Sequence, residues 1–372
     1  MSKRLIVCCD GTWNSADDEN PTNVSKIALA VAAQDGTGKE QRTYYHRGVG
    51  TDKRERVRGG AFGVGLSRDV RNAYRFLVEN YEPGDEIYFF GFSRGAFTAR
   101  STAGFVGNCG VLRREHTHRL DEAYALYRNK SKTTMRKGTE AILFRRSFSH
   151  EAHIEFIGVF DTVGSLGIPL HLWNLTRMIN RRWAFHDTTL SPTVRSAYHA
   201  LAIDEKRRPF RPTLWTPNTD AAPGPKDPPP ENQEVEQVWF AGVHKDVGGG
   251  YEVHGLSDIS LLWMVDRARA CGVKFRPDAF VDASSREGAP PVGDPALRAY
   301  TAVNPNTFGK LNESRKGLFK IFPGYSRRFG EGLPGTEYLS STAEARYDRN
   351  DGYAPRGLVD YLEGAPQFKT VR

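Results

Sequence analysis

Short apolar runs rich in β-branched and aromatic residues recur along the chain, and most of them end at a glycine or a polar turn. Runs of this length and composition predict strands. We expect five of them, at 4–9, 41–46, 86–90, 154–160 and 235–241.

The segments between these runs repeat their apolar residues at intervals of three and four, which is typical of helices with one buried face. Because strands and helices alternate, the sequence predicts an α/β fold, with a mainly parallel central sheet flanked by helices. Helices are expected at 23–33, 66–81, 96–106, 120–127, 193–203 and 258–271.

The domain organisation follows from where this pattern is interrupted. We expect 1–372 to form a single domain whose core spans about 1–272. The polar stretch at 112–150 and the stretch at 165–192 are expected to be helical insertions or cap segments. After residue 272 the pattern weakens, so 273–372 is expected to be a C-terminal extension packed on the core.

The composition is that of a globular protein, with 39% hydrophobic and 26% charged residues. No stretch approaches the roughly 18 consecutive apolar residues that a membrane-spanning helix requires. Only five apolar residues follow the basic pair Lys3 and Arg4, fewer than a signal peptide needs. We therefore expect a cytoplasmic protein, with export by a dedicated machine that needs no cleavable signal left open.

The net charge of +8 mildly favours anionic partners such as phospholipid headgroups or nucleic acid. A basic surface without a dedicated partner explains most of this charge, and no nucleic acid is expected as a partner. The cysteines include no Cys-x-x-Cys pair, so buried reduced thiols are expected rather than disulfides or zinc ligands. No metal ion or cofactor is expected. The cysteines are Cys8, Cys9, Cys109 and Cys271.

The sequence Gly-Phe-Ser-Arg-Gly at 91–95 has the Gly-x-Ser-x-Gly pattern of a nucleophile elbow, in which a strand turns sharply into a helix. A strand is expected before it and a helix after it, as the elbow requires. The two glycines have a physical reason, because strand and helix approach so closely that a side chain would obstruct them. Ser93 is therefore a candidate nucleophile, and the helix behind it offers backbone N–H groups to an oxyanion.

A serine nucleophile needs a base and a carboxylate that orients the base. Asp161 directly follows the strand expected at 154–160, and His244 follows the strand expected at 235–241. The carboxyl ends of parallel strands share one edge of a sheet, so both residues should lie near Ser93. The order serine, aspartate, histidine is that of the α/β-hydrolases and differs from the orders in chymotrypsin and subtilisin.

Two other aspartates compete with Asp161 for the role of the acid. Asp246 lies two residues from His244, and we expect it instead to hold the surrounding glycine loop through backbone N–H groups. Asp204 is the second rival and has a weaker strand-end context.

An oxyanion hole needs two N–H donors. The first is expected from Arg94, directly after the nucleophile, and the second from the loop after the first strand, at Gly11 and Thr12. Asp10 is expected to be a structural residue that binds the neighbouring loop, because its charge would oppose a nearby anion. Asp10 and Asp246 could alternatively share a divalent cation, although their spacing specifies no such site.

Seven motifs occur in order along the chain. They are Cys-Asp-Gly-Thr-Trp-Asn at 9–14, Tyr-His-Arg-Gly-Val-Gly-Thr at 45–51, Gly-Phe-Ser-Arg-Gly-Ala at 91–96, Gly-Val-Phe-Asp-Thr-Val at 158–163, Ala-Leu-Ala-Ile-Asp-Glu at 200–205, Phe-Arg-Pro-Thr-Leu-Trp at 210–215 and Gly-Val-His-Lys-Asp-Val-Gly-Gly-Gly-Tyr at 242–251. As a set they resemble the uncharacterised α/β-hydrolase domain family that includes the phospholipase effectors of the bacterial type VI secretion system.

The resemblance covers roughly residues 4 to 265 and implies an α/β-hydrolase fold. It implies a triad of Ser93, Asp161 and His244, and ester hydrolysis, with phospholipid cleavage known for the secreted effectors. The chain departs from those effectors in that it is expected to be close to a bare catalytic domain, without their additional membrane-anchoring regions.

We therefore expect a serine ester hydrolase that forms an acyl-enzyme and acts on lipid or other carboxylic esters. Alternatives are a soluble carboxylesterase, thioesterase or polyesterase, an acyltransferase, and a non-catalytic binding module with a hydrolase fold. The stretch at 165–185 is either a lid that meets a lipid surface or a packed cap. The basic and aromatic segment at 316–328 is either a contact with anionic lipid or nucleic acid, or a solvated surface with a few buried aromatic residues. Candidate substrate contacts in the cap are Leu172, Trp173 and Trp183.

Overall fold

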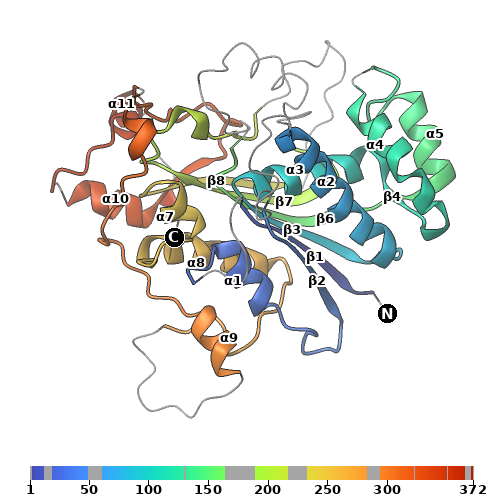
Figure 1. The fold of residues 1–372 in the computed structure, drawn as a ribbon, viewed down its shortest axis with the longest axis horizontal. Coiled ribbons are helices and arrows are strands. Elements are labelled where there is room, and N and C mark those ends of the chain that lie inside the picture. Colours follow the sequence, from blue (N-terminus) through green and yellow to red (C-terminus); the bar gives the residue numbers. More distant parts are fainter. Residues whose placement is uncertain are drawn as a thin grey trace.

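The computed structural model of the chain has one eight-stranded sheet at its centre, with helices packed against both faces (Figure 1). This arrangement confirms the expected α/β fold with a mainly parallel central sheet flanked by helices. The residues that the structure describes are 2–11, 19–48, 61–129, 131–163, 189–216, 233–282, 294–321, 323–349, 351–364 and 370–371.

Every pairing between the described strands of this sheet is parallel, and the order across it is β10-β9-β8-β7-β6-β3-β1-β2. β2 lies on one side of β1 and the next strand along the chain, β3, lies on its other side. This reversal creates a topological switch point at the carboxyl edge. Sites in open parallel sheets form at such points. The strands are β1 (Arg4–Cys9), β2 (Gln41–His46), β3 (Glu86–Phe92), β6 (Ile154–Phe160), β7 (Val194–Ala202), β8 (Glu234–Phe240), β9 (Glu337–Ser340) and β10 (Thr370–Val371).

Both faces of the sheet are buried, and alternate residues of β1 belong to different cores. Leu5 and Val7 pack with residues of α2 and α3, whereas Ile6 and Cys8 pack with residues of α1 and α8. The sheet is therefore the middle layer of three, and its carboxyl edge is held rigidly from two sides. The helices are α1 (Asn23–Ala30), α2 (Ala61–Asn80), α3 (Arg94–Cys109), α7 (His244–Gly248) and α8 (Gly255–Ala270).

The five strands expected from the sequence are present, and each bound agrees within two residues. The expected helices are also present with one exception, and their ends differ by a few residues. α1 ends at Ala30, before the expected residue 33, because Val31 is extended and forms a bridge with Phe275.

The helix expected at 193–203 is wrong, because this segment forms β7, paired with β6 on one side and β8 on the other. Within β7 only Arg195 is exposed. Its three alanines favoured a helix. A strand buried on both faces has no alternation of apolar and polar residues, so periodicity cannot distinguish it from a buried helix.

The segment at 112–150, expected to be an insertion, forms a helical layer beyond the end of α3. Tyr127 of this layer stacks on Phe105 of α3, with 5.2 Å between the ring centroids. A short antiparallel pair of strands, β4 and β5, closes the segment. Its main elements are β4 (Val111–Leu112), α4 (Leu120–Arg128), α5 (Thr139–Phe148) and β5 (Ser149–His150).

The segment after residue 272 extends the sheet itself, since β9 pairs with β8 and β10 pairs with β9. A third core joins it to the sheet, with Trp239 of β8 and Leu339 of β9 both buried. The loop before β9 runs toward the carboxyl ends of β6 and β8, where it reaches the candidate site. Helices of this segment include α9 (Pro295–Tyr300), α10 (Ser341–Asp348) and α11 (Arg356–Gly364).

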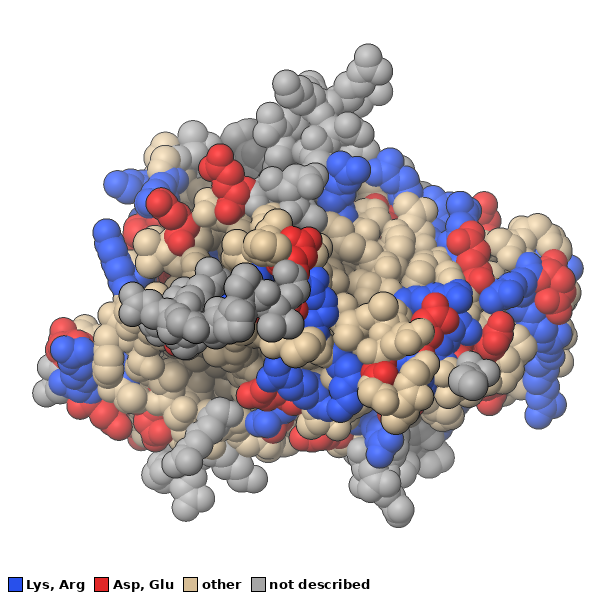
Figure 2. Space-filling view, turned by 90° about the horizontal axis from the view of Figure 1, so that it is seen from below, with Lys and Arg blue, Asp and Glu red and all other residues tan. Residues whose placement is uncertain are grey.

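On the face shown in Figure 2, basic and acidic side chains are interspersed. Among the described residues, no helix has both the length and the apolar character needed to cross a bilayer.

Candidate active site

The turn between β3 and α3 holds Ser93 in a strained backbone conformation. Its φ of 58° and ψ of −118° lie in a region that residues other than glycine rarely adopt. A Cβ at Gly91 would lie 2.5 Å from the Cα of Ala96, and a Cβ at Gly95 would lie 2.1 Å from the carbonyl oxygen of Cys9. Only glycine fits at these two positions, which is the geometry that the Gly-x-Ser-x-Gly pattern predicts.

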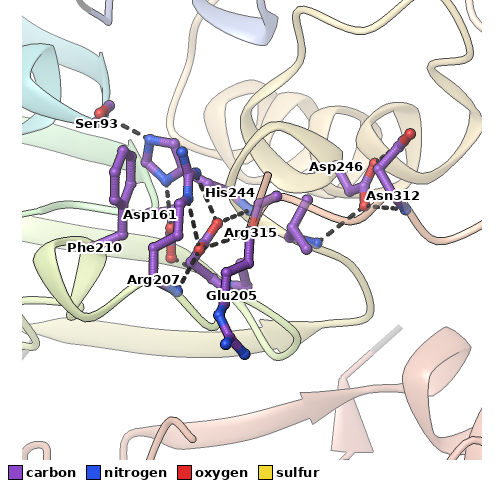
Figure 3. A network of polar contacts seen from close by, with 12 residues as sticks. Ser93, Asp161, Glu205, Arg207, Phe210, His244, Asp246, Asn312 and Arg315 are labelled. Carbon is purple, nitrogen blue, oxygen red and sulfur yellow. Dashed lines mark hydrogen bonds and ion pairs between the residues drawn. The ribbon is translucent and has the colours of Figure 1, made fainter. Parts of the chain in front are cut away.

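His244 is the first residue of α7, directly after the loop that follows β8. Its Nε2 lies 2.8 Å from the Oγ of Ser93, and its Nδ1 lies 2.5 Å from the Oδ2 of Asp161 (Figure 3). The imidazole contacts the rings of Phe92 and Phe210, with centroid distances of 4.7 and 4.9 Å. The ring is therefore fixed by its two hydrogen bonds and by aromatic packing.

Asp161 follows β6 and has a φ of 41°, which is uncommon outside glycine. Its N–H donates to the carbonyl of Ala200 at 2.7 Å, and its Oδ1 accepts the N–H of Ala202 at 3.1 Å. Both partners belong to β7, so the strand that the sequence analysis predicted as a helix positions this carboxylate.

Burial and neighbouring charges set the protonation of the pair. Burial alone would raise the pKa of Asp161, but Arg327 and His244 outweigh it and hold this pKa below its usual range. Burial also lowers the pKa of His244 below its ordinary value of 6.5, and Asp161 offsets this only in part. At neutral pH, Asp161 is thus charged and His244 neutral, so the Nδ1–H of the imidazole donates to the carboxylate and the Nε2 lone pair faces Ser93.

Arg327 belongs to this site, although in the sequence it is recognisable only as part of a basic segment. Its Nη2 donates to the Oδ2 of Asp161 at 2.9 Å, and its Nη1 donates to the Oδ1. Both side chains are fully buried. The two residues are 166 positions apart, and no motif or spacing signals such a contact.

A second buried carboxylate, that of Glu205, holds the backbone of His244 (Figure 3). It accepts the His244 N–H at 3.3 Å and two hydrogen bonds from the Arg207 guanidinium at 2.9 Å each. Ser314 donates to the same carboxylate at 2.8 Å. Burial opposes the charge, but Arg207 outweighs it, so the pKa of Glu205 is lowered. Glu205 ends the motif at 200–205, but nothing in the sequence pattern indicates this role.

The rival aspartates hold the loop around the histidine. Asp246 accepts the N–H of Val243 at 3.0 Å and the side-chain amide of Asn312 at 2.7 Å. Asp204 accepts the N–H of Gly242 at 2.7 Å. Both carboxylates therefore bind backbone next to the histidine, as expected for Asp246, while the carboxylate at the end of β6 contacts the imidazole.

Arg94, the residue after Ser93, is the first residue of α3. Its backbone N–H lies in the first turn of the helix, where the aligned peptide dipoles favour negative charge. Burial lowers the pKa of the Arg94 side chain to about 10. The backbone position is the one that an oxyanion donor after the nucleophile requires.

The structure describes only Gly11 of the two residues expected to supply the second oxyanion donor. The N–H of Gly11 donates to the carboxylate of Asp10 at 2.6 Å, so it is engaged in this conformation. Asp10 is buried and also accepts the hydroxyls of Thr22 and Tyr45 at 2.7 Å, which fits the expected structural role. Thr12 lies outside the described residues.

The three candidate cap residues also lie outside the described residues, and they are Leu172, Trp173 and Trp183. Within the described ranges, no group of three or more His, Cys, Asp or Glu side chains is placed to hold a metal ion. Asp10 and Asp246, considered for a shared cation, each bind their own set of protein partners.

Several known proteins are similar to this chain. The uncharacterized protein YEL023C of Saccharomyces cerevisiae is 31% identical over 237 residues, which are 58% of this chain and 33% of the yeast protein. A crystal structure of an uncharacterized protein from Pseudomonas aeruginosa is 18% identical with a TM-score of 0.48, over 82% of this chain and 49% of that one. The Tle1 effector, solved bound to the VgrG spike of the type 6 secretion system, is 17% identical with a TM-score of 0.36, over 68% and 51%. The matches thus cover between 33% and 51% of these relatives' lengths.

Residues 3–267 match the family model of the type VI secretion system phospholipase effector Tle1-like catalytic domain. The match runs from β1 into α8 and includes Ser93, Asp161 and His244. It covers well over half of the 372 residues. The chain therefore belongs to the Tle1-like phospholipase effector catalytic domain family.

Proposed function

We propose that this chain is a serine hydrolase that cleaves carboxylic esters of phospholipids. Ser93 is the nucleophile, His244 the general base, and Asp161 the carboxylate that orients the base. The observation that carries the proposal is the distance of 2.8 Å from the Oγ of Ser93 to the Nε2 of His244, on an elbow whose glycines cannot be replaced. Membership in a phospholipase effector family supports the same activity.

In the first half of the reaction, His244 takes the hydroxyl proton of Ser93 on Nε2 while the Oγ attacks the acyl carbonyl carbon. The carbonyl oxygen becomes an oxyanion, which accepts hydrogen bonds from the backbone N–H of Arg94 and, in this proposal, from that of Thr12. The charged Asp161 stabilises the imidazolium that forms beside it.

The tetrahedral intermediate then collapses, and Nε2 of His244 returns its proton to the departing alcohol oxygen of the lysophospholipid. A water molecule enters, gives one proton to Nε2 and attacks the acyl carbon. The ester bond to Ser93 breaks, its Oγ regains the proton, and a fatty acid is released.

The turn at 316–321 supports a lipid surface as the substrate's location. It contains exposed basic and apolar side chains, and Ile321 is 76% exposed. Phe319 of the turn lies 6.4 Å from the ring of Phe210, which contacts the imidazole of the site. A bilayer that met this turn would therefore lie beside the nucleophile, with its anionic headgroups near two lysines. The exposed residues are Lys316, Lys320 and Ile321.

Vesicles of phosphatidylglycerol and phosphatidylcholine test the proposal, with free fatty acid and lysophospholipid measured by mass spectrometry. Wild-type protein should release both products, and Ser93→Ala protein should release neither. Turnover of soluble p-nitrophenyl esters without phospholipid cleavage would instead favour a soluble carboxylesterase. Absence of both activities in folded protein would favour the non-catalytic binding module.

The surface part of the proposal has its own matched pair of variants. Ile321→Asp should lower the ratio of vesicle to soluble-ester activity by about 10-fold, because one large apolar side chain no longer enters the bilayer. Leu143→Asp is the control, since Leu143 is also exposed, at 62%, but lies on α5. Equal ratios for the two variants would contradict a membrane contact at the 316–321 turn.

A further inference from the structure

The guanidinium of Arg327 is buried at the centre of the candidate site and uses both terminal nitrogens. Each Nη donates once to the carboxylate of Asp161 and once to a backbone carbonyl. The two carbonyls are those of Ala202 and Phe210, at 2.7 Å each. Two charge-assisted hydrogen bonds in a planar fork fix both the position and the plane of a carboxylate.

Asp161 has a full set of donors only when Arg327 is counted. A carboxylate offers about four acceptor sites. In this site they accept hydrogen bonds from the Nδ1–H of His244, the N–H of Ala202 and the two Nη groups of Arg327. Removing the arginine would leave a fully buried charge with half of its hydrogen bonds and no cation in contact.

The loop that carries Arg327 is itself fixed to the core. Phe329 packs on Trp239 of β8 with 4.2 Å between the ring centroids, and the N–H of Tyr325 donates to the carbonyl of Lys206 at 2.9 Å. A Cβ at Gly357 of α11 would lie 1.9 Å from the carbonyl oxygen of Arg327, so helix and loop are in close contact. The loop that carries Arg327 and the helix α11 both lie beyond residues 3–267, the stretch that matches the family model.

We infer that Arg327 is a positioning residue of the active site, which orients Asp161 and balances its charge, so that the C-terminal segment completes the catalytic machinery. The inference rests on the proposed function and deepens it. It assigns a role in the reaction to a segment that lies outside the family match.

The charge balance has a consequence for proton uptake. With Arg327 present, the positive charge of its guanidinium opposes protonation of the Asp161–His244 pair. Without it, the pair carries an uncompensated negative charge and takes up a proton at higher pH, whichever of the two residues receives it. Among the described residues, Glu205 and Arg207 also act on the charge of His244. They are unchanged in the variants below.

Another titratable group lies near Asp161, the fully buried His199. Burial holds its pKa well below the ordinary value, and the charges of Arg100 and Arg327 lower it further. Its Nε2 accepts the N–H of Thr162 at 3.1 Å. Burial is the largest of these causes and remains when Arg327 is replaced, so the change in proton uptake is expected at the aspartate–histidine pair.

The test compares Arg327→Met, Arg327→Lys and the neighbouring control Arg328→Met, whose native side chain is 77% exposed. For a soluble p-nitrophenyl ester, Arg327→Met should lower kcat on the order of 10²-fold with KM unchanged, less than loss of the carboxylate itself would. The acid limb of its pH profile should move upward by about 1 pH unit. Arg327→Lys should keep the acid limb and lose part of kcat, since it retains charge without the fork. Arg328→Met should match wild type.

A folded Arg327→Met enzyme with the kcat and acid limb of wild type would overturn the inference. If that variant does not fold, Arg327→Lys decides, because wild-type kcat in it would show that the fork is not needed.

A readout without turnover separates this inference from the proposed function. The low-field proton resonance of the Nδ1–H of His244, followed by NMR against pH in a Ser93→Ala background, should titrate at higher pH when Arg327 is replaced by Met. An unchanged titration would contradict the inference even if the wild-type enzyme proves inactive on every ester.

Discussion

Two aspartate–histidine pairs in this molecule share most of their features. Asp161 contacts His244 and Asp258 contacts His254, each with 2.5 Å between the Oδ2 and the Nδ1. Both carboxylates are fully buried, and each has a cation at its other oxygen, an arginine in the first pair and a lysine in the second. Local composition alone would not tell them apart.

Their positions in the fold differ. His254 and Asp258 lie four residues apart at the start of α8, the His254 side chain is 37% exposed, and Lys26 of α1 reaches the carboxylate at 2.8 Å. This pair connects two helices on one face of the sheet. The imidazole of His244 is buried at the carboxyl edge of the sheet and turns its Nε2 to Ser93. The same three groups, a carboxylate, an imidazole and a cation, therefore connect two helices in the Asp258–His254 pair. In the Asp161–His244 pair they form a candidate catalytic unit, because the second ring nitrogen faces Ser93.

The largest expected difference follows from removing each carboxylate. Asp161→Asn should lower kcat for ester hydrolysis by about 10⁴-fold, because an amide can donate to Nδ1 and so favour the wrong tautomer of His244. Steady-state kinetics with a soluble p-nitrophenyl ester measures this, and thermal melting verifies folding. Wild-type kcat in folded Asp161→Asn protein would mean that the first pair is as structural as the second.

The matched change at the second pair should affect stability instead. Asp258→Asn should leave kcat unchanged but lower the free energy of unfolding by about 3–5 kcal/mol, because Lys26 remains buried without its counter-charge. Urea unfolding measures the loss. A large fall in kcat of the folded variant would place the second pair in the catalytic machinery and remove the distinction between the two.

The pH dependence of activity sharpens the comparison further. His244 must be neutral to accept a proton, and burial lowers its pKa below 6.5. Activity should therefore persist below pH 6.5 and be lost only as the pH falls through this lowered pKa. The profile of kcat/KM for a soluble ester shows the acid limb directly. An acid limb above pH 6.5 would mean that the charge of Asp161 outweighs burial at His244.

The smallest effect is expected from His254→Ala. Asp258 keeps its contact with Lys26 and still accepts the N–H of Asn304 at 2.7 Å, so only one hydrogen bond is lost. The free energy of unfolding should fall by about 1 kcal/mol, and the acid limb should not move. A shift of the acid limb in this variant would show that the second histidine influences the first.

The candidate residues that follow strands were accessible from the sequence. Ser93, Asp161 and His244 each follow a strong apolar run, and parallel strands bring their carboxyl ends to one edge. The glycines around the serine signalled the close approach of β3 and α3. These are local patterns, and a single sequence is enough to recognise them.

Features that depend on tertiary packing were not accessible. The segment 193–203 was predicted as a helix because a strand covered on both faces has no alternating pattern. Arg327 reaches Asp161 only because β9 joins the sheet beside β8 and brings the preceding loop to the site. The role of Glu205 likewise depends on how its loop folds against the N-terminus of α7. In each case the missing information is a contact between distant parts of the chain.

The most direct test of the central claim is labelling by a fluorophosphonate probe, which reacts with activated serines. Wild-type protein should be labelled, Ser93→Ala should not be, and Asp258→Asn should be labelled like wild type. This outcome would establish Ser93 as the nucleophile and the second pair as structural. Absence of labelling in folded wild-type protein, or labelling that persists in Ser93→Ala, would contradict the account.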